Sequence, residues 1–192
     1  MTRKYTQLTF TPAVKRLQSD LGSRDSAAQV EAWDIDDEHL SMREAVFISQ
    51  RDSFYMATVT EDGWPYVQFR GGPPGFLRVI DESTLGYADL RGNRQYISLG
   101  NLGETNRAAL FFMNYGAKQR LKMMARTETL LPAEHPELLE QLSTPDESSH
   151  IERLVLFHIE AFEWNCPKHI TPRFTAKEWQ DMQDNQDQRD PS

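Results

Sequence analysis

Residues 54–95 read FYMATVTEDGWPYVQFRGGPPGFLRVIDESTLGYADLRGNRQ. This stretch predicts two antiparallel hairpins that lead into a helix. The first strand is β-branched and aromatic, and Glu61-Asp62-Gly63 supplies turn chemistry, because Gly63 can adopt a positive φ. Asp81-Glu82-Ser83 separates the second pair of strands. The four expected strands are residues 54–60, 66–70, 76–80 and 84–88. Short strands joined by tight turns favour a mainly β, antiparallel fold.

Two polar side chains share a face of the second strand. Side chains alternate across a strand, so Gln68 and Arg70 lie on one face while Val67 and Phe69 lie on the other. This pattern indicates a face that is either solvated or turned toward a ligand. Gly71-Gly72-Pro73-Pro74-Gly75 then breaks the strand, and its glycines permit a close approach to the backbone.

A possible anion site follows the second hairpin. Asn93 is a plausible N-cap for a helix through Leu99, and the free N–H groups at a helix start favour an anion. Arg91 and Arg94 add guanidinium groups, which bind phosphate in a bidentate manner. The alternative is a solvated helix start with surface arginines. Combined with Gln68, these residues suggest a site for a planar ligand with a phosphate tail.

Three segments together carry a family resemblance: DSFYMATVTEDGWPYVQFRGGPPGFLRVID (52–81), LGYADLRGNRQYISLGNL (85–102) and EWNCPKHITPRF (163–174). They resemble the pyridoxamine 5'-phosphate oxidase-like family of FMN-binding split barrels, most closely its branch of general flavin-nucleotide-binding proteins. The resemblance covers residues 47–174. It implies an α+β fold that is mainly β with peripheral helices, built as an antiparallel six-stranded split β-barrel. It also implies a homodimer with FMN at the subunit interface.

The resemblance also implies which residues bind the cofactor. They are Gln68, Arg70, Gly71, Gly72, Asp89, Gly92, Asn93, Arg94, Gln95, Arg120, Lys122, Trp164 and Asn165. Arg120 and Lys122 would reach the flavin of the partner subunit, and Trp164 would pack beside the isoalloxazine ring. From the residues alone, two other interpretations stay open. Arg120, Lys122 and Arg126 share one face of a strand, and charge patterning alone favours a solvated outer face. Trp164 can be a plain hydrophobic anchor.

The sequence assigns no catalytic residue and no metal site. His158 and Glu160 share a strand face, but a solvated pair is commoner than an acid–base pair, and no third group supports catalysis. Cys166 and His169 have the spacing of zinc ligands, but a structural zinc site needs four ligands and no second pair is visible.

The function implied by the resemblance is an FMN-dependent oxidoreductase of unknown substrate, with a nicotinamide or another small molecule as electron donor. The alternatives are a non-catalytic flavin sensor or carrier, or a split barrel that uses F420 or haem. The Arg-x-His pattern near the C-terminus of the vitamin B6 oxidases is absent, which argues against that activity.

Composition limits the other classes. The chain has 192 residues, a formal net charge of −8 and a pI of about 5.1, so a general nucleic-acid binder is not expected. Cys166 is the only cysteine, and no apolar run approaches the about 20 residues of a membrane span, so we expect a cytoplasmic protein.

The expected organisation has three parts: an N-terminal helical extension (1–46) packing on the barrel, the flavin-binding split barrel (47–174), and a polar, partly disordered tail (175–192). Helices are predicted at 11–21, 36–49, 132–142 and 175–182. The remaining strands are predicted at 107–115, 120–129 and 153–162, and residues 184–192 are expected to be disordered.

Overall fold

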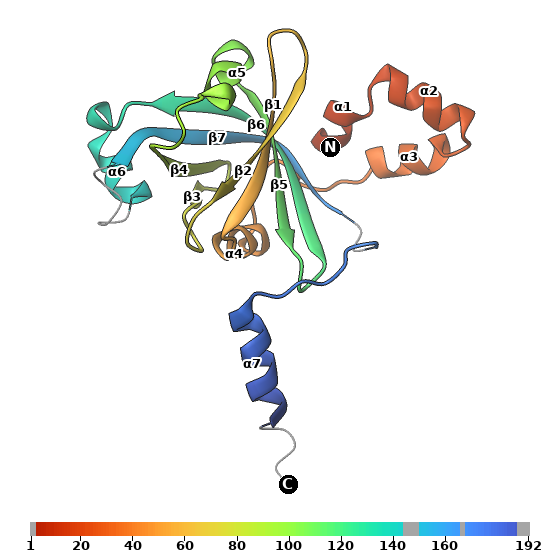
Figure 1. The fold of residues 1–192 in the computed structure, drawn as a ribbon. Helices are drawn as coiled ribbons and strands as arrows, with labels where there is room; N and C mark the ends of the chain where they lie inside the picture. Colours follow the sequence, from red (N-terminus) through yellow and green to blue (C-terminus); the bar gives the residue numbers. More distant parts are fainter. Residues whose placement is uncertain (1–2, 144–149, 166–167, 188–192) are drawn as a thin grey trace.

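The computed structural model describes residues 3–143, 150–165 and 168–187. Its centre is one antiparallel sheet of seven strands in the order β2-β1-β5-β6-β7-β4-β3 (Figure 1). The strands are β1 (Ser53–Val59), β2 (Pro65–Gly71), β3 (Arg78–Asp81), β4 (Thr84–Leu90), β5 (Arg107–Asn114), β6 (Gln119–Leu130) and β7 (Ile151–Trp164). The predicted antiparallel α+β fold is confirmed. The sheet has seven strands, one more than the six that the resemblance implies, and each of the seven strands predicted from the sequence is present.

The sheet curls until its two ends approach each other. β2 forms one edge and β4 lies next to the other edge, yet Arg70 Nη1 on β2 is 3.0 Å from Asp89 Oδ1 on β4. No ladder of backbone hydrogen bonds joins these two strands, since each pairs with other neighbours. We call this opening between β2 and β4 the seam.

The core fills the inside of the curl. Phe54, Phe112 and Phe157 are almost completely buried, and the ring centroid of Phe54 lies 5.6 Å from that of Phe112 and 6.0 Å from that of Phe157. Phe54 and Met56 alternate with the exposed Tyr55 on β1, as period-two patterning requires. The buried side of each strand therefore faces the inside of the curl, and the other side faces outward.

Two helices begin later than the sequence indicates. The helix expected from Asp36 is α4 (Met42–Ser49), which starts at a capping box formed by Ser41 and Glu44. Asp36 instead accepts hydrogen bonds from the backbone N–H groups of Glu38 and His39, a turn that competes with helix.

The helix expected from Asn93 is α5 (Ile97–Thr105), which runs beyond the predicted end at Leu99. The side chain of Asn93 accepts from the backbone N–H of Gln95, 3.1 Å away, so Asn93 forms a local turn and is not the N-cap. The residue at the N-cap is Tyr96, which makes no side-chain cap and has a φ of 54°. Helix α5 packs against β1.

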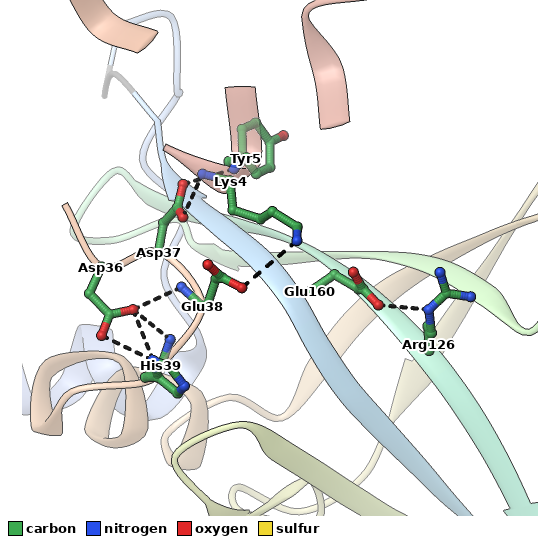
Figure 2. Close-up of polar contacts among 8 residues, drawn as sticks. All are labelled: Lys4, Tyr5, Asp36, Asp37, Glu38, His39, Arg126 and Glu160. Atoms are coloured by element: carbon green, nitrogen blue, oxygen red, sulfur yellow. Dashed lines mark hydrogen bonds and ion pairs between the residues drawn. The ribbon is translucent and has the colours of Figure 1, made fainter. Parts of the chain in front are cut away.

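Three short helices precede the barrel: α1 (Lys4–Thr9), α2 (Pro12–Asp20) and α3 (Arg24–Glu31). The predicted start of α2 is confirmed, since the Thr11 hydroxyl accepts from the N–H of Val14. Asp37 anchors α1 by accepting from the backbone N–H groups of Lys4 and Tyr5, at 3.0 and 2.9 Å (Figure 2). Helix α1 contacts β7, whereas α2 and α3 lie to one side of the sheet (Figure 1).

The segment between β6 and β7 contains η1 (Pro132–Glu134) and α6 (Pro136–Leu142), where a helix was predicted. The C-terminal helix α7 (Ala176–Asp187) projects away from the sheet (Figure 1) and is longer than predicted. Residues 184–187, where disorder was expected, belong to α7, and residues 188–192 lie outside the described part. No helix in the described ranges has the length and apolar character that crossing a membrane requires.

Candidate functional site

A cleft of about 160 Å³ opens along the seam, and we call it the seam cleft. Its walls come from β2, β4, the loop before α5, the first turn of α5, and Glu152 at the start of β7. Seven of the predicted cofactor residues line it: Gln68, Arg70, Asp89, Gly92, Asn93, Arg94 and Gln95. Residues from two separate stretches of the central segment, 66–70 and 89–95, therefore meet at one opening.

Strand parity places the β2 residues in this cleft. Gln68 pairs with the buried Met56 and Arg70 with the buried Phe54, and directly paired residues share a face, so both side chains lie on the inner side of the sheet. The Gln68 Oε1 accepts from the Ser98 hydroxyl at 2.5 Å. This bond occupies the carbonyl side of the amide and leaves the Gln68 nitrogen as the donor for a ligand.

Arg70 carries an unused hydrogen-bond donor. Its Nη1 pairs with Asp89, but its Nε is buried and has no hydrogen-bond partner among the described residues. Burial raises the pKa of Asp89, an effect that the positive charges of Arg70 and Arg153 oppose. A buried guanidinium donor without an acceptor is a feature that a ligand oxygen would satisfy.

The loop before α5 is held in an unusual conformation. Arg94 and Tyr96 have φ values of 62° and 54°, in the left-handed region that non-glycine residues seldom adopt. Arg94 is exposed, and its Nε donates to the Tyr96 hydroxyl at 3.4 Å. Because α5 starts without a side-chain cap and residues 96–99 line the cleft, its first N–H groups add to the donor set.

Gly71 and Gly72 line a neighbouring cleft of about 240 Å³, on the other side of the Arg70–Asp89 pair. A Cβ at Gly72 would lie 2.7 Å from the Phe76 ring, and one at Gly71 would lie 2.8 Å from the Phe69 ring. Gly72 is thus needed for close packing against Phe76, whereas the exposed Phe69 ring beside Gly71 can move aside. Tyr87 also lines this cleft, and burial raises the pKa of its hydroxyl.

The structure places Arg120 and Lys122 on the opposite side of the sheet. Lys122 pairs with Phe111 and Phe111 with Tyr55, and this row faces outward. The Lys122 Nζ forms an ion pair with Glu163 at 2.8 Å. Within one chain, neither Arg120 nor Lys122 can contribute to the seam cleft.

Of the three cations predicted on β6, Arg120 differs from the other two. Arg126 pairs with Glu160 at 2.7 Å (Figure 2), as Lys122 does with Glu163, whereas the Arg120 Nε is buried without a hydrogen-bond partner in the described part of the chain. Arg120 lines a separate cleft of about 310 Å³, shared with Arg173 and others. Sequence reasoning missed Arg173, although it lies in the quoted C-terminal motif.

Trp164 and Asn165 also lie outside the seam cleft. The Trp164 Nε1 donates to Glu44 at 2.6 Å, and its ring packs edge-on against Phe47 at 4.7 Å, with the Arg43 guanidinium 4.3 Å from the ring centroid. The backbone N–H of Asn165 donates to the carbonyl of Arg120. In a single chain Trp164 acts as an anchor between β7 and α4.

The remaining candidates make local contacts. His158 hydrogen-bonds to Glu128 and Glu160 pairs with Arg126, so each has its own cross-strand partner. Cys166 lies outside the described residues. Within the described ranges, no group of three or more His, Cys, Asp or Glu side chains is arranged to hold a metal ion.

Seven further residues line the seam cleft and were not predicted as cofactor residues, among them Tyr96, Ser98 and Glu152. Tyr96 and Ser98 lie inside the quoted motif. They were missed because the helix was expected to start at Asn93, whereas it starts at Ile97. Glu152 is far away in sequence, and no local pattern connects it to the cleft.

Comparison with known proteins identifies the family of the chain. The family model described as pyridoxamine 5'-phosphate oxidase matches residues 42–181. No curated protein matches the sequence significantly.

Among solved structures, one similar fold is that of a putative pyridoxamine 5'-phosphate oxidase from Lactobacillus delbrueckii, with 22% identity, a TM-score of 0.51, and coverage of 67% of this chain and 97% of that chain. HupZ from Group A Streptococcus has 12% identity and a TM-score of 0.50, with 70% and 100% covered. A conserved hypothetical protein from Mycobacterium tuberculosis has 14% identity and a TM-score of 0.51, with 76% and 97% covered. At these identities the structures show a shared fold. Because the family model spans most of the chain, the chain belongs to the pyridoxamine 5'-phosphate oxidase-like family of FMN-binding split barrels.

Proposed function

We propose that the seam cleft holds the phosphate of FMN and that the protein is an FMN-dependent oxidoreductase of unknown substrate. One observation carries the proposal: the guanidinium groups of Arg70 and Arg94 and the uncapped start of α5 line one cleft. Guanidinium and backbone N–H groups are the donors that phosphate binding requires. The unused Nε of Arg70 supports a bound acceptor at this place.

The other cofactor residues follow from the same placement. Asn93, Gln95 and the backbone at Gly92 surround the phosphate end. Gln68 offers its amide nitrogen to an acceptor on the isoalloxazine edge. Gly71 and Gly72 let the ring approach the end of β2, where Cβ atoms would displace the neighbouring phenylalanines. When bound, the flavin supplies the redox chemistry and the chain supplies binding and electrostatics.

We further propose that the protein is a homodimer and that each flavin site is completed by the partner subunit. The support is the outward side of β1 and β2, where apolar side chains are exposed: Tyr55, Val59, Val67 and Phe69. This row continues across β5 to Lys122 and Arg120. In this dimer we expect Arg120, Lys122, Trp164 and Asn165 of one chain to approach the flavin of the other, and Arg173 shares a cleft with Arg120.

The proposal predicts a coloured protein. The test is the visible absorbance spectrum of the purified protein, recorded with its mass on size exclusion. The twin bands of oxidised flavin on a dimer, or their appearance after FMN is added to a colourless dimer, support the proposal. If the protein binds F420 or haem in preference to FMN, the fold assignment stands and the assignment of FMN as cofactor is wrong. A protein that binds none of the three contradicts the redox function.

Turnover is a separate question with its own test. Bleaching of the bound flavin by NADH or NADPH, followed by reoxidation with an acceptor, supports an enzyme with a nicotinamide donor. A flavin that stays oxidised with every donor favours the alternative of a flavin sensor or carrier.

A further inference from the structure

Glu152 stands in the seam cleft among the groups that a phosphate would use. It is the second residue of β7, and its side chain is 24% exposed. Its carboxylate accepts from the Tyr96 hydroxyl at 3.2 Å and from Arg153 Nη1 at 3.2 Å, and it lies 3.8 Å from Arg91 Nε. One carboxylate therefore collects two guanidinium groups and a hydroxyl, which is a donor set suited to an external anion.

Among the side chains that line the cleft, Glu152 balances the charge, and Arg91 and Arg153 contact it from outside the lining. Its charged lining consists of Arg70, Arg94, Asp89 and Glu152, two positive and two negative side chains. Asp89 is paired with Arg70. Glu152 is then the carboxylate that offsets the second cation of the lining, and without its charge the lining would carry one net positive charge, with Arg91 and Arg153 beside it.

Tyr96 links Glu152 to Arg94. The Tyr96 hydroxyl accepts from Arg94 Nε at 3.4 Å and donates to Glu152 at 3.2 Å. The Arg153 guanidinium lies 5.0 Å from the centroid of the Tyr96 ring. These contacts tether a loop whose backbone at Arg94 and Tyr96 is in the left-handed region. The position of Arg94 thus depends on a chain of contacts that ends at Glu152.

We propose that Glu152 is a built-in anionic competitor in the seam cleft: it holds the cationic groups in place when no ligand is present and opposes the binding of phosphate through its own negative charge. The inference rests on the proposed phosphate site of FMN. Glu152 accordingly sets how strongly the protein prefers FMN to riboflavin, which lacks the phosphate.

A purely structural role for Glu152 makes the opposite prediction. If Glu152 only positions the arginines, then removing its charge disorders them and weakens phosphate binding. Glu152→Gln separates the two roles, because glutamine retains the size of the side chain and an oxygen acceptor for Tyr96 but has no charge. Glu128→Gln is the matched control, since it removes one negative charge from β6 at an exposed residue outside the cleft.

The experiment measures the affinity of the full chain and both variants for inorganic phosphate, FMN and riboflavin at constant ionic strength. Thermal unfolding establishes that each variant is folded. We expect Glu152→Gln to bind inorganic phosphate and FMN on the order of fivefold more tightly than the unsubstituted protein, with riboflavin affinity unchanged. We expect Glu128→Gln to change none of the three.

Weaker or unchanged phosphate binding by folded Glu152→Gln overturns the inference, as does an equal gain in Glu128→Gln. Tighter phosphate binding without binding of either flavin supports the inference and contradicts the FMN assignment. Absence of phosphate and flavin binding in all three proteins contradicts both.

Discussion

The guanidinium of Arg70 lies 3.0 Å from the carboxylate of Asp89 and joins β2 to β4 across the seam. These strands are not neighbours in the sheet, so this ion pair ties together the two ends of the curl beside the proposed phosphate site. Both side chains are largely shielded from water, at 22% and 17% exposed. Removing one partner therefore leaves a poorly solvated charge on the other.

Arg70→Met is expected to lower the free energy of unfolding by about 1–3 kcal/mol near neutral pH. Burial already raises the pKa of Asp89 above its ordinary value, and loss of the Arg70 charge raises it further. A carboxyl with a raised pKa in the folded state contributes stability that is present below its ordinary pKa and is lost as pH rises through the folded pKa.

The cost of Arg70→Met is therefore expected to be larger at about pH 7.5 than at about pH 5, as measured by urea unfolding. The double variant Arg70→Met/Asp89→Asn should recover most of the loss, because no unpaired carboxylate remains. If the loss in free energy of unfolding is independent of pH and is not recovered by the second substitution, the Arg70–Asp89 pair does not stabilise the contact between β2 and β4.

Trp164→Phe tests the anchor between β7 and α4. Phenylalanine keeps a ring against Phe47 but removes the Nε1–H that donates to Glu44. Burial alone would raise the pKa of Glu44, but hydrogen bonds from Ser41 and Trp164 hold it below its ordinary value. We expect a loss of about 1–2 kcal/mol in the free energy of unfolding at neutral pH.

The pH dependence of this loss has a definite sign. A depressed carboxyl pKa contributes stability above the ordinary pKa of Glu44 and loses it as pH falls through the folded pKa, so the variant and the unsubstituted protein should converge in acid. The proposed dimer adds a second readout, because Trp164 would also approach the partner's flavin. Reduced FMN affinity with unchanged stability would indicate that the ring serves the flavin and is not an anchor.

Val67→Glu tests the proposed dimer. Val67 is 61% exposed on the outward side of β2, so in a monomer this change should alter the free energy of unfolding by less than about 1 kcal/mol. In the proposed dimer it buries a charge in the interface. We expect a monomer on size exclusion and FMN affinity reduced on the order of tenfold or more.

Leu21→Glu is the control for Val67→Glu, since Leu21 is 75% exposed, lies at the end of α2 and is not part of the sheet. It should remain dimeric with unchanged FMN affinity. A monomeric Val67→Glu variant that retains full FMN affinity would contradict a site shared by two chains.

Local sequence patterns predicted most of the sheet. Alternation on β2 placed Gln68 and Arg70 on one face and Val67 and Phe69 on the other, because period-two patterning follows directly from strand geometry. The start of α2 was predictable for the same kind of reason, since Thr11 and Pro12 are a local capping signal.

The misplaced elements depended on contacts that the local sequence does not encode. Asn93 and Asp36 have side chains that suit both a helix cap and a turn, and in each case the turn prevailed. Helix α1 is held by Asp37, 32 residues beyond Tyr5, and Trp164 is held by Glu44 at a separation of 120 residues.

The candidate site was predictable only in part for a related reason. Seven of the motif residues between Gln68 and Gln95 meet at one cleft, because the curl of the sheet brings β2 to β4. Arg120 and Lys122 lie on one side of the sheet and Arg70 lies on the other. The pairing of β2, β1, β5 and β6 decides this, and no local pattern reveals it. Glu152 could not be found from a motif, since its place in the cleft depends on the pairing of β7 with β4.

The affinity of Arg94→Ala for FMN and for riboflavin tests the central claim most directly. If the Arg94 guanidinium binds the phosphate, the substitution should weaken FMN by about 1.5–3 kcal/mol and leave riboflavin almost unchanged. Arg78→Ala, an exposed arginine on β3 outside the seam cleft, is the matched control and should affect neither ligand. An equal loss of affinity for both flavins, or no loss for FMN, would contradict a phosphate site in the seam cleft.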